Sequence, residues 1–394
     1  MKILRKLFDD FKPKVAKGGK FHWLHSTFDA FETFAFVPKT TAKSGAHLRD
    51  AIDMKRAMVI VIAAVIPALL FGMYNVGYGH YLSQGQSLSE VGFWQIFWYG
   101  FLKVLPMIVI SYVVGLGIEF IFAQKRGHEV NEGYLVTGML IPLICPPDVP
   151  LWQLALAVAF AVIIGKEIFG GTGMNFLNPA LVARAFLFFS YPSQMSGDSV
   201  WIADKADAIS GATPLGEMMT GGVMPNYSIM DMFLGFVPGS VGETSVIAIL
   251  IGAAILLVTG IASWRIMMSV FIGATAMGLT FNLLGSSTNA YMQLPFYYHF
   301  LMGGFMFGAV FMATDPVTAS QTNRGKYIYG LLIGIIAVLI RVINPAYPEG
   351  MMLAILLLNV FAPLIDHFVV DRNIKKRTKR ANLALKNASN KITN

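Results

Sequence analysis

Long apolar runs recur along the chain from residue 56 to residue 370 and are separated by shorter polar segments. A helix needs about 20 consecutive apolar residues to cross the hydrocarbon core of a membrane. The runs predict ten spans, at 56–75, 94–122, 134–145, 151–169, 176–191, 243–263, 265–285, 296–314, 327–343 and 351–370. The predicted fold is therefore an all-α polytopic membrane protein.

The composition agrees with this pattern. Of the residues, 55% are hydrophobic and only 13% are charged, whereas ordinary soluble domains are about 45–50% apolar and about 25% charged. This excludes an ordinary soluble enzyme. The single cysteine, Cys145, lies in an apolar run, so this chain alone supplies no disulfide, iron–sulfur cluster or cysteine-based zinc site.

Positive charge is concentrated at the two ends of the chain. Twelve of the 30 Lys and Arg residues precede Met58, and eight follow Val370. The segments 76–92, 146–150 and 286–295, between predicted spans, contain no Lys or Arg. By the positive-inside rule these segments face outward and both termini face the cytoplasm. The net charge of +8 therefore indicates a membrane lipid surface as the partner, and no nucleic acid.

The first 55 residues contain no predicted span and form a basic, aromatic arm. Their aromatic run is typical of a helix lying in the membrane interface, and equally of a segment packed against a partner protein. The apolar residues that recur there at helical spacing are Leu24, Phe28, Phe31 and Ala35, with Trp23 beside them.

A weak internal repeat divides the membrane region into two units of five spans. Residues 137–150 resemble residues 307–317, and the Asn-Pro-Ala of 178–180 recurs at 344–346, with separations between 166 and 170 residues. An odd number of spans per unit forces an inverted topology, with broken half-helices where spans are short. A chance match among spans rich in Gly and Pro is the alternative. The predicted regions are a cytoplasmic arm (1–55), a first repeat (56–191), an external loop (192–230), a second repeat (231–370) and a basic cytoplasmic tail (371–394).

The external loop contains a short motif that carries chemistry, Ser210-Gly211-Ala212-Thr213, followed by Pro214. Its composition alone is that of a turn. The motif resembles the Ser/Thr-Gly-Ala-Thr signature in which the hydroxyl of the last threonine is esterified to the phosphate of FMN. Because a proline biases the residue before it to extended backbone, Pro214 favours presentation of the Thr213 hydroxyl.

This motif, the segments 128–143 and 173–186, and both tails resemble one family of flavin-carrying membrane proteins. The family comprises the B subunit of the sodium-translocating NADH:quinone oxidoreductase and the D subunit of the Rnf electron-transport complex; the long aromatic arm favours the quinone-reducing enzyme. The resemblance implies covalent FMN at Thr213, noncovalent riboflavin, and electron transfer to ubiquinone coupled to Na⁺ export. It also implies a six-subunit complex in the bacterial inner membrane, matured by a flavin transferase.

The resemblance also implies positions for the other ligands. A riboflavin is expected near Asn178, with Asn344 and Arg184 as further candidates. Amides supply the paired donors and acceptors that a flavin ring needs, and Arg184 is an intramembrane charge. Asparagine before proline is also a good helix N-cap, which is the alternative. For ubiquinone, the resemblance points to Gly115, Gly117 and the arm residues Trp23, Phe28 and Phe31.

Few acidic residues lie at membrane depth, and three of them are candidates for a Na⁺ path: Glu119, Asp148 and Asp315. Sodium prefers hard oxygen ligands, which carboxylates and unwound backbone carbonyls provide. Glu119 lies close to Gly115 and Gly117, while the repeat relates Asp148 to Asp315. Both of these aspartates adjoin proline, so turn formation is the alternative role.

A passive channel or a secondary transporter of urea-transporter type is the rival interpretation. Inverted five-span repeats with broken helices suit solute permeation. A channel, however, has no use for an esterified flavin. The sequence therefore predicts the redox subunit of an ion pump, which passes electrons from NADH towards ubiquinone.

Overall fold

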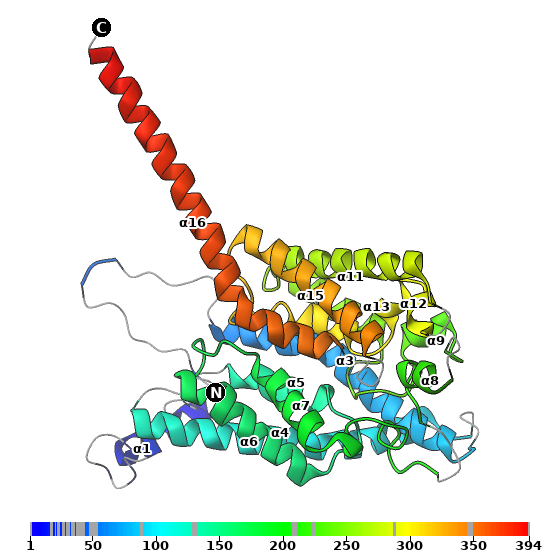
Figure 1. Ribbon diagram of the computed structural model, residues 1–394. Coiled ribbons are helices and arrows are strands. Elements are labelled where there is room, and N and C mark those ends of the chain that lie inside the picture. Colours follow the sequence, from blue (N-terminus) through cyan, green and yellow to red (C-terminus); the bar gives the residue numbers. More distant parts are fainter. Residues whose placement is uncertain are drawn as a thin grey trace. The chain divides into compact units, whose positions relative to one another are not determined.

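The structure is a computed structural model (Figure 1). It describes residues 2–15, 54–86, 90–127, 133–206, 211–221, 225–286, 289–344 and 350–392, with scattered positions between 19 and 46. Across these ranges the chain is helical and forms no strand. The expectation of an all-helical chain is confirmed for this part of the molecule.

The chain divides into two compact units. The first comprises Met1–Asn175, Pro179–Thr213 and Leu234–Ile261; the second comprises Phe176–Asn178, Pro214–Phe233 and Ala262–Asn394. These units do not coincide with the two predicted repeats, because helix α10 (Val246–Val258) packs on α3 (Met54–Ser83) of the first unit. The inverted repeat itself stays a prediction.

Six helical segments are long and apolar enough to cross a membrane: Met54–Ser83, Phe93–Arg126, Leu151–Phe169, Trp264–Leu284, Asn323–Ile343 and Gly350–Ala384. They include α3, α4 (Phe93–Arg126), α6 (Leu151–Gly165), α11 (Trp264–Leu284), α15 (Asn323–Ile343) and most of α16 (Gly350–Ile392). The chain is therefore a multi-pass membrane protein.

The other predicted spans contain shorter helices. They are α5 (Tyr134–Leu143), α7 (Pro179–Ser190) and α10, while residues 296–314 hold α13 (Tyr298–Leu301), α14 (Phe305–Phe307) and the π-helical η4 (Gly308–Met312). The described part of the predicted external loop (192–230) also contains η3 (Pro192–Gln194) and α8 (Pro214–Gly221), and α9 (Ile229–Leu234) begins at its end. The ten-span arrangement stays a prediction for these segments.

Glycines bring the helices of each unit into direct backbone contact. On α3 and α4, Gly77 faces the carbonyl of Ile96, and Gly100 faces the carbonyl of Met73. In the second unit α11 packs on α15 in the same way, with Gly334 against the carbonyl of Val270. Small residues at helix crossings are the usual basis of packing inside membranes, because apolar burial gives little advantage over lipid.

The basic tail is not a separate element. Helix α16 continues without a break through residues 371–392, and the side chains from 372 to 384 are exposed. Lys, Arg, Ala and Leu are good helix formers, and an Asp371–Lys375 ion pair of 2.6 Å bridges one turn. The polar tail is therefore a helical extension of the last apolar segment (Figure 1).

The helix contact at Gly100 gives a stability prediction. A Cβ at Gly100 would overlap the Met73 carbonyl, whereas a Cβ at Gly117 on the same helix meets nothing within 4 Å. We expect Gly100→Ala to lower the free energy of unfolding by about 1–3 kcal/mol, because overpacking forces the backbones apart. Thermal unfolding of the detergent-solubilised chain measures this, with Gly117→Ala as the matched control. Equal melting temperatures for the two variants would contradict the contact.

Candidate functional site

Thr213 lies where the two units join along the chain. It is the last residue of a segment of the first unit, and Pro214 begins both α8 and a segment of the second unit. Gly211, Ala212 and Pro214 are buried, while Thr213 is half-buried. Ser210, the first residue of the motif, lies outside the described residues. The threonine is thus set between well-packed neighbours.

The preceding loop explains why the motif contains glycine. A Cβ on Gly211 would lie 2.7 Å from the Asp198 carbonyl oxygen and 3.3 Å from the Ile202 side chain. A real Cβ does not approach backbone oxygen so closely, so this loop requires Gly211. Ile202 is buried, and a Cβ on Gly79 of α3 would lie 3.8 Å from its Cγ2. Within the first unit, the motif is therefore packed on the loop that precedes it.

The residues after Thr213 are held within the second unit. The Tyr291 hydroxyl donates to the Leu215 carbonyl at 2.6 Å. The Leu215 side chain faces Gly303, whose φ of +63° is accessible mainly to glycine. In the first turn of α8, the Glu217 carboxylate accepts a hydrogen bond of 3.0 Å from the Asn226 backbone N–H. The first turn of α8 is therefore fixed immediately after the motif.

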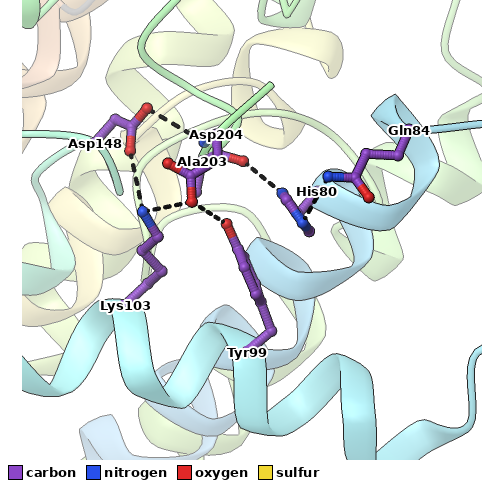
Figure 2. Close-up of polar contacts among 7 residues, drawn as sticks. All are labelled: His80, Gln84, Tyr99, Lys103, Asp148, Ala203 and Asp204. Atoms are coloured by element: carbon purple, nitrogen blue, oxygen red, sulfur yellow. Dashed lines mark hydrogen bonds and ion pairs between the residues drawn. The ribbon is translucent and has the colours of Figure 1, made fainter. Parts of the chain in front are cut away.

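Five polar side chains of the first unit gather on the loop that leads to the motif (Figure 2). Lys103 lies 2.7 Å from Asp204 Oδ2 and 3.9 Å from Asp148 Oδ1. The other contacts are Tyr99 Oη to Asp204 Oδ2 (2.6 Å), Asp204 N to Asp148 Oδ2 (3.4 Å) and His80 Nδ1 to Ala203 O (3.0 Å). Helices α3 and α4 thus contribute three side chains to one short loop.

The two carboxylates of this cluster respond to it in opposite ways. Hydrogen bonds from Lys103 and Tyr99 hold the pKa of Asp204 below its usual value. Burial raises the pKa of Asp148, although Lys103 opposes that shift. Asp148, a predicted Na⁺ ligand, is therefore already close to a cation supplied by this chain.

Glu119 also has a cation partner. It is buried on α4 and forms an ion pair with Lys166, which is buried in the turn after α6. The Lys166 ammonium lies 5.8 Å from the centroid of the Tyr134 ring, and that ring fills the space beside Gly115. Lys166 lies within the predicted span 151–169 and carried no predicted role. A charged residue near the end of a long apolar run was the signal that it needs a partner.

Asp315 and Asn178 are brought together within the second unit. Asn178 Nδ2 lies 3.4 Å from Asp315 Oδ2, which also accepts from the Thr318 hydroxyl at 2.9 Å. The Val317 N–H donates to Asp315 Oδ1 at 3.1 Å. These local bonds are those of an aspartate that stabilises a turn, so the alternative role of Asp315 is present in the structure.

The remaining candidates lie in different surroundings. Arg184 is buried in α7 with its guanidinium 5.8 Å from the Trp201 ring centroid. Asn344 is exposed and ends α15, with its N–H bonded to Ile340 O, while α16 begins only at Gly350. Asn344 therefore caps the carboxyl end of α15, whereas Asn178 directly precedes α7.

In the arm, the rings of Phe28 and Phe8 lie 5.4 Å apart, and those of Phe28 and Phe11 lie 6.0 Å apart, so Phe28 packs on α1 (Lys2–Val15). Trp23 and Phe31 lie outside the described residues. Within the described part of the chain, no group of three or more His, Cys, Asp or Glu side chains is placed to hold a metal ion.

Comparison with known proteins matches residues 41–375 to the NQR2, RnfD, RnfE family. The chain is 50% identical to the Chromohalobacter salexigens protein named as the B subunit of Na(+)-translocating NADH-quinone reductase, over 96% of each protein. It is 50% identical to the protein of the same name from Ectopseudomonas mendocina and 48% identical to that from Azotobacter vinelandii. In both cases the match covers 96% of this chain and 99% of the relative.

The buried Glu119–Lys166 pair gives a second stability prediction. Glu119→Ala leaves the Lys166 ammonium buried without its partner, which costs about 3–5 kcal/mol of folding free energy. The exposed Asp371–Lys375 pair is the control, and Asp371→Ala should cost less than about 1 kcal/mol. Chemical denaturation of the full chain in detergent measures both changes.

The double variant Glu119→Leu/Lys166→Met tests the same pair by removing both charges instead of one. Removing both charges leaves neither side chain uncompensated, so this variant should be more stable than Glu119→Ala. A double variant no more stable than Glu119→Ala would show that the pair contributes little.

Proposed function

The chain belongs to the NQR2, RnfD, RnfE family, and from this membership we propose that it is the flavin-carrying membrane subunit of a respiratory sodium pump. In this proposal, electrons from NADH pass through covalent FMN and riboflavin to ubiquinone, and their transfer drives Na⁺ export. One observation carries the proposal. Identity near 50% extends over almost the full length of proteins named as the B subunit of the Na⁺-translocating reductase.

The surroundings of Thr213 support its role as the FMN attachment site. When bound, FMN supplies electron transfer, while its phosphate serves as the tether. Thr213 directly precedes Pro214, the first residue of α8, so a phosphate on its hydroxyl would lie near a helix N-terminus, where the helix dipole favours negative charge. The close contact of Gly211 with the Asp198 carbonyl sets the path of the backbone into Thr213. Ser210, Gly211 and Ala212 complete the motif.

For riboflavin we propose a position near Asn178. This side chain is buried, and its amide lies beside the Asp315 carboxylate. An amide in such a place can orient a flavin ring, because it both donates and accepts hydrogen bonds. Arg184 is a further candidate by its burial, and Asn344 is the weakest because it is exposed at the end of α15.

For ubiquinone we propose the region of Gly115 and Gly117 with the aromatic arm, including Trp23, Phe28 and Phe31. Gly117 has open space where a side chain would stand, whereas Gly115 accommodates the Tyr134 ring. An unoccupied glycine face on α4 can admit a flat quinone ring close to the helix backbone. Aromatic side chains from the arm would supply the apolar contacts.

The proposed Na⁺ path uses Glu119, Asp148 and Asp315. Two electrons falling through about 300 mV release about 14 kcal/mol, while moving one sodium ion against about 150 mV costs about 3.5 kcal/mol. Electron transfer can therefore drive export. Lys166 and Lys103 stand beside two of these carboxylates, so sodium would have to compete with or displace an ammonium group there.

We further propose that the chain works in a six-subunit complex of the bacterial inner membrane, with both termini in the cytoplasm, and that a flavin transferase loads Thr213. The D subunit of an Rnf-type complex is the second candidate, since the matched family includes RnfD. The relatives named above favour the quinone reductase. The channel interpretation has no comparable support.

The attachment site is tested with Thr213→Val. The variant keeps the branched shape and removes the hydroxyl, so covalent flavin should disappear while the folded yield stays unchanged. In-gel fluorescence of the denatured chain measures this, because only covalent flavin survives denaturation. Ser210→Ala is the matched control from the same motif and should retain most of the signal. Undiminished fluorescence in Thr213→Val would show that flavin is attached at another residue.

The sodium path is tested with Asp148→Asn, Asp315→Asn and Glu119→Gln. Asparagine serves in turns about as well as aspartate, so the aspartate changes separate charge from turn geometry. We expect at least one variant to need more sodium for half-maximal quinone reductase activity, with covalent flavin unchanged. Asp371→Asn, from an exposed ion pair, is the control. Parental sodium dependence in all three variants would assign these carboxylates to structure alone.

A further inference from the structure

We propose that Lys103 and Tyr99 of α4, together with His80 of α3, form a clamp that positions the flavin-bearing loop on the membrane helices. The inference rests on the proposed attachment of flavin at Thr213. All members of the clamp, and Thr213 itself, belong to the first unit. The clamp holds residues 203 and 204, which precede the flavin attachment site by ten and nine residues.

Two side chains of one helix bind the Asp204 carboxylate. Lys103 and Tyr99 are four residues apart on α4, so they share a face. Both contact the same carboxylate oxygen, at 2.7 Å and 2.6 Å. Figure 2 shows the two side chains converging on Asp204 from α4. Charge-assisted bonds of this length are the stronger class of hydrogen bond, so the loop is tied to α4 at one point.

His80 holds the neighbouring residue. Its ring stacks on that of Tyr99, with centroids 3.9 Å apart and planes inclined by 13°. Nδ1 lies 3.0 Å from the Ala203 carbonyl and Nε2 lies 3.1 Å from Gln84 Nε2. A carbonyl only accepts, so the neutral ring with its proton on Nδ1 satisfies both contacts. His80 therefore joins the loop backbone to both helices.

The backbone of Asp204 shows that the loop is constrained here. Its φ of +45° is the one positive value among the non-glycine residues that the structure describes. Such a conformation has a free-energy cost and persists where surrounding contacts determine it. The bonds from Lys103, Tyr99 and Asp148 are those contacts.

Side-chain packing at Ile202 links the clamped residues to the flavin motif. Ile202 directly precedes the clamped residues, is buried, and faces Gly79 on α3. The same Ile202 side chain, with the Asp198 carbonyl, defines the space that Gly211 fills. Gly211 is two residues from Thr213. A loop released at Asp204 would therefore loosen the surface on which the motif lies.

Lys103→Met tests the clamp, with Lys125→Met, an exposed lysine on the same helix, as the matched control. Trypsin cleavage after Lys205 reports release of the loop, because cleavage requires local opening. We expect Lys103→Met to accelerate this cleavage and Lys125→Met to leave it at the parental rate. Tyr99→Phe keeps the ring stacking and loses only the hydroxyl, so it should accelerate cleavage less than Lys103→Met does. If Lys103→Met does not fold, Tyr99→Phe tests the clamp in its place.

The functional readout is quinone reductase activity of the whole complex, normalised to in-gel flavin fluorescence of this chain. Small misplacement of a reacting group lowers rates by about tenfold or more, so kcat should fall by about that factor in Lys103→Met. The KM for quinone should not change. Lys103→Arg should keep kcat near the parental value, because it keeps a positive charge beside Asp204.

The outcomes separate this inference from the function on which it rests. No covalent fluorescence in the parental chain would overturn the flavin assignment and with it the role of the clamp. Parental fluorescence with parental kcat in Lys103→Met would overturn the clamp alone, whether or not cleavage after Lys205 accelerates. Faster cleavage, lower kcat, unchanged KM and rescue by Lys103→Arg together support it.

Discussion

In the hydrocarbon core of a membrane there is no water to hydrogen-bond a buried polar group, so the protein itself must supply every partner. The rest of this structure follows from that requirement. Glu119 and Lys166 are both buried and pair with each other. Arg341, also buried, donates to the carbonyls of His299 and Met302 at the end of the short helix α13. In both of these places a buried charge lies beside a partner that the chain supplies.

The same requirement explains why glycine is so frequent at the helix contacts. Helices in a membrane gain little from burying apolar surface against each other, so they associate through close contact. Gly77 and Gly100 allow this between α3 and α4, and Gly334 allows it between α15 and α11. The closely packed helices α3 and α4 also carry the side chains that contact the loop at residues 203–204. The polar chemistry therefore concentrates at helix ends and loops, where Thr213, Asp148 and Asp315 lie.

The Thr213 segment combines two kinds of support. Before it, the loop at residues 198–206 is packed on α3 and α4; after it, α8 is held by Tyr291 and Gly303. Under the proposed function Thr213 carries FMN, and it then needs a fixed backbone, because the tether alone leaves the ring free to move. The clamp on Asp204 and the bond to Leu215 supply that fixed backbone from residues far from the motif in sequence.

The sequence by itself determined the membrane class, the helical character and the presence of the Ser-Gly-Ala-Thr motif, because these depend on local runs of residue types: apolar length, charge placement and the order of four residues. Only the tertiary structure decided which residues surround these features. Lys166, which lies within the predicted span 151–169, is the buried partner of Glu119. Lys103, His80 and Tyr99 carry no motif and converge on one loop. Asn344, which the repeat relates to Asn178, caps the carboxyl end of α15. α10, placed with the second repeat by its order, packs on α3. Pairings of this kind depend on which helix faces meet across long stretches of chain, and apolar periodicity alone does not specify them when every face of a span can contact lipid.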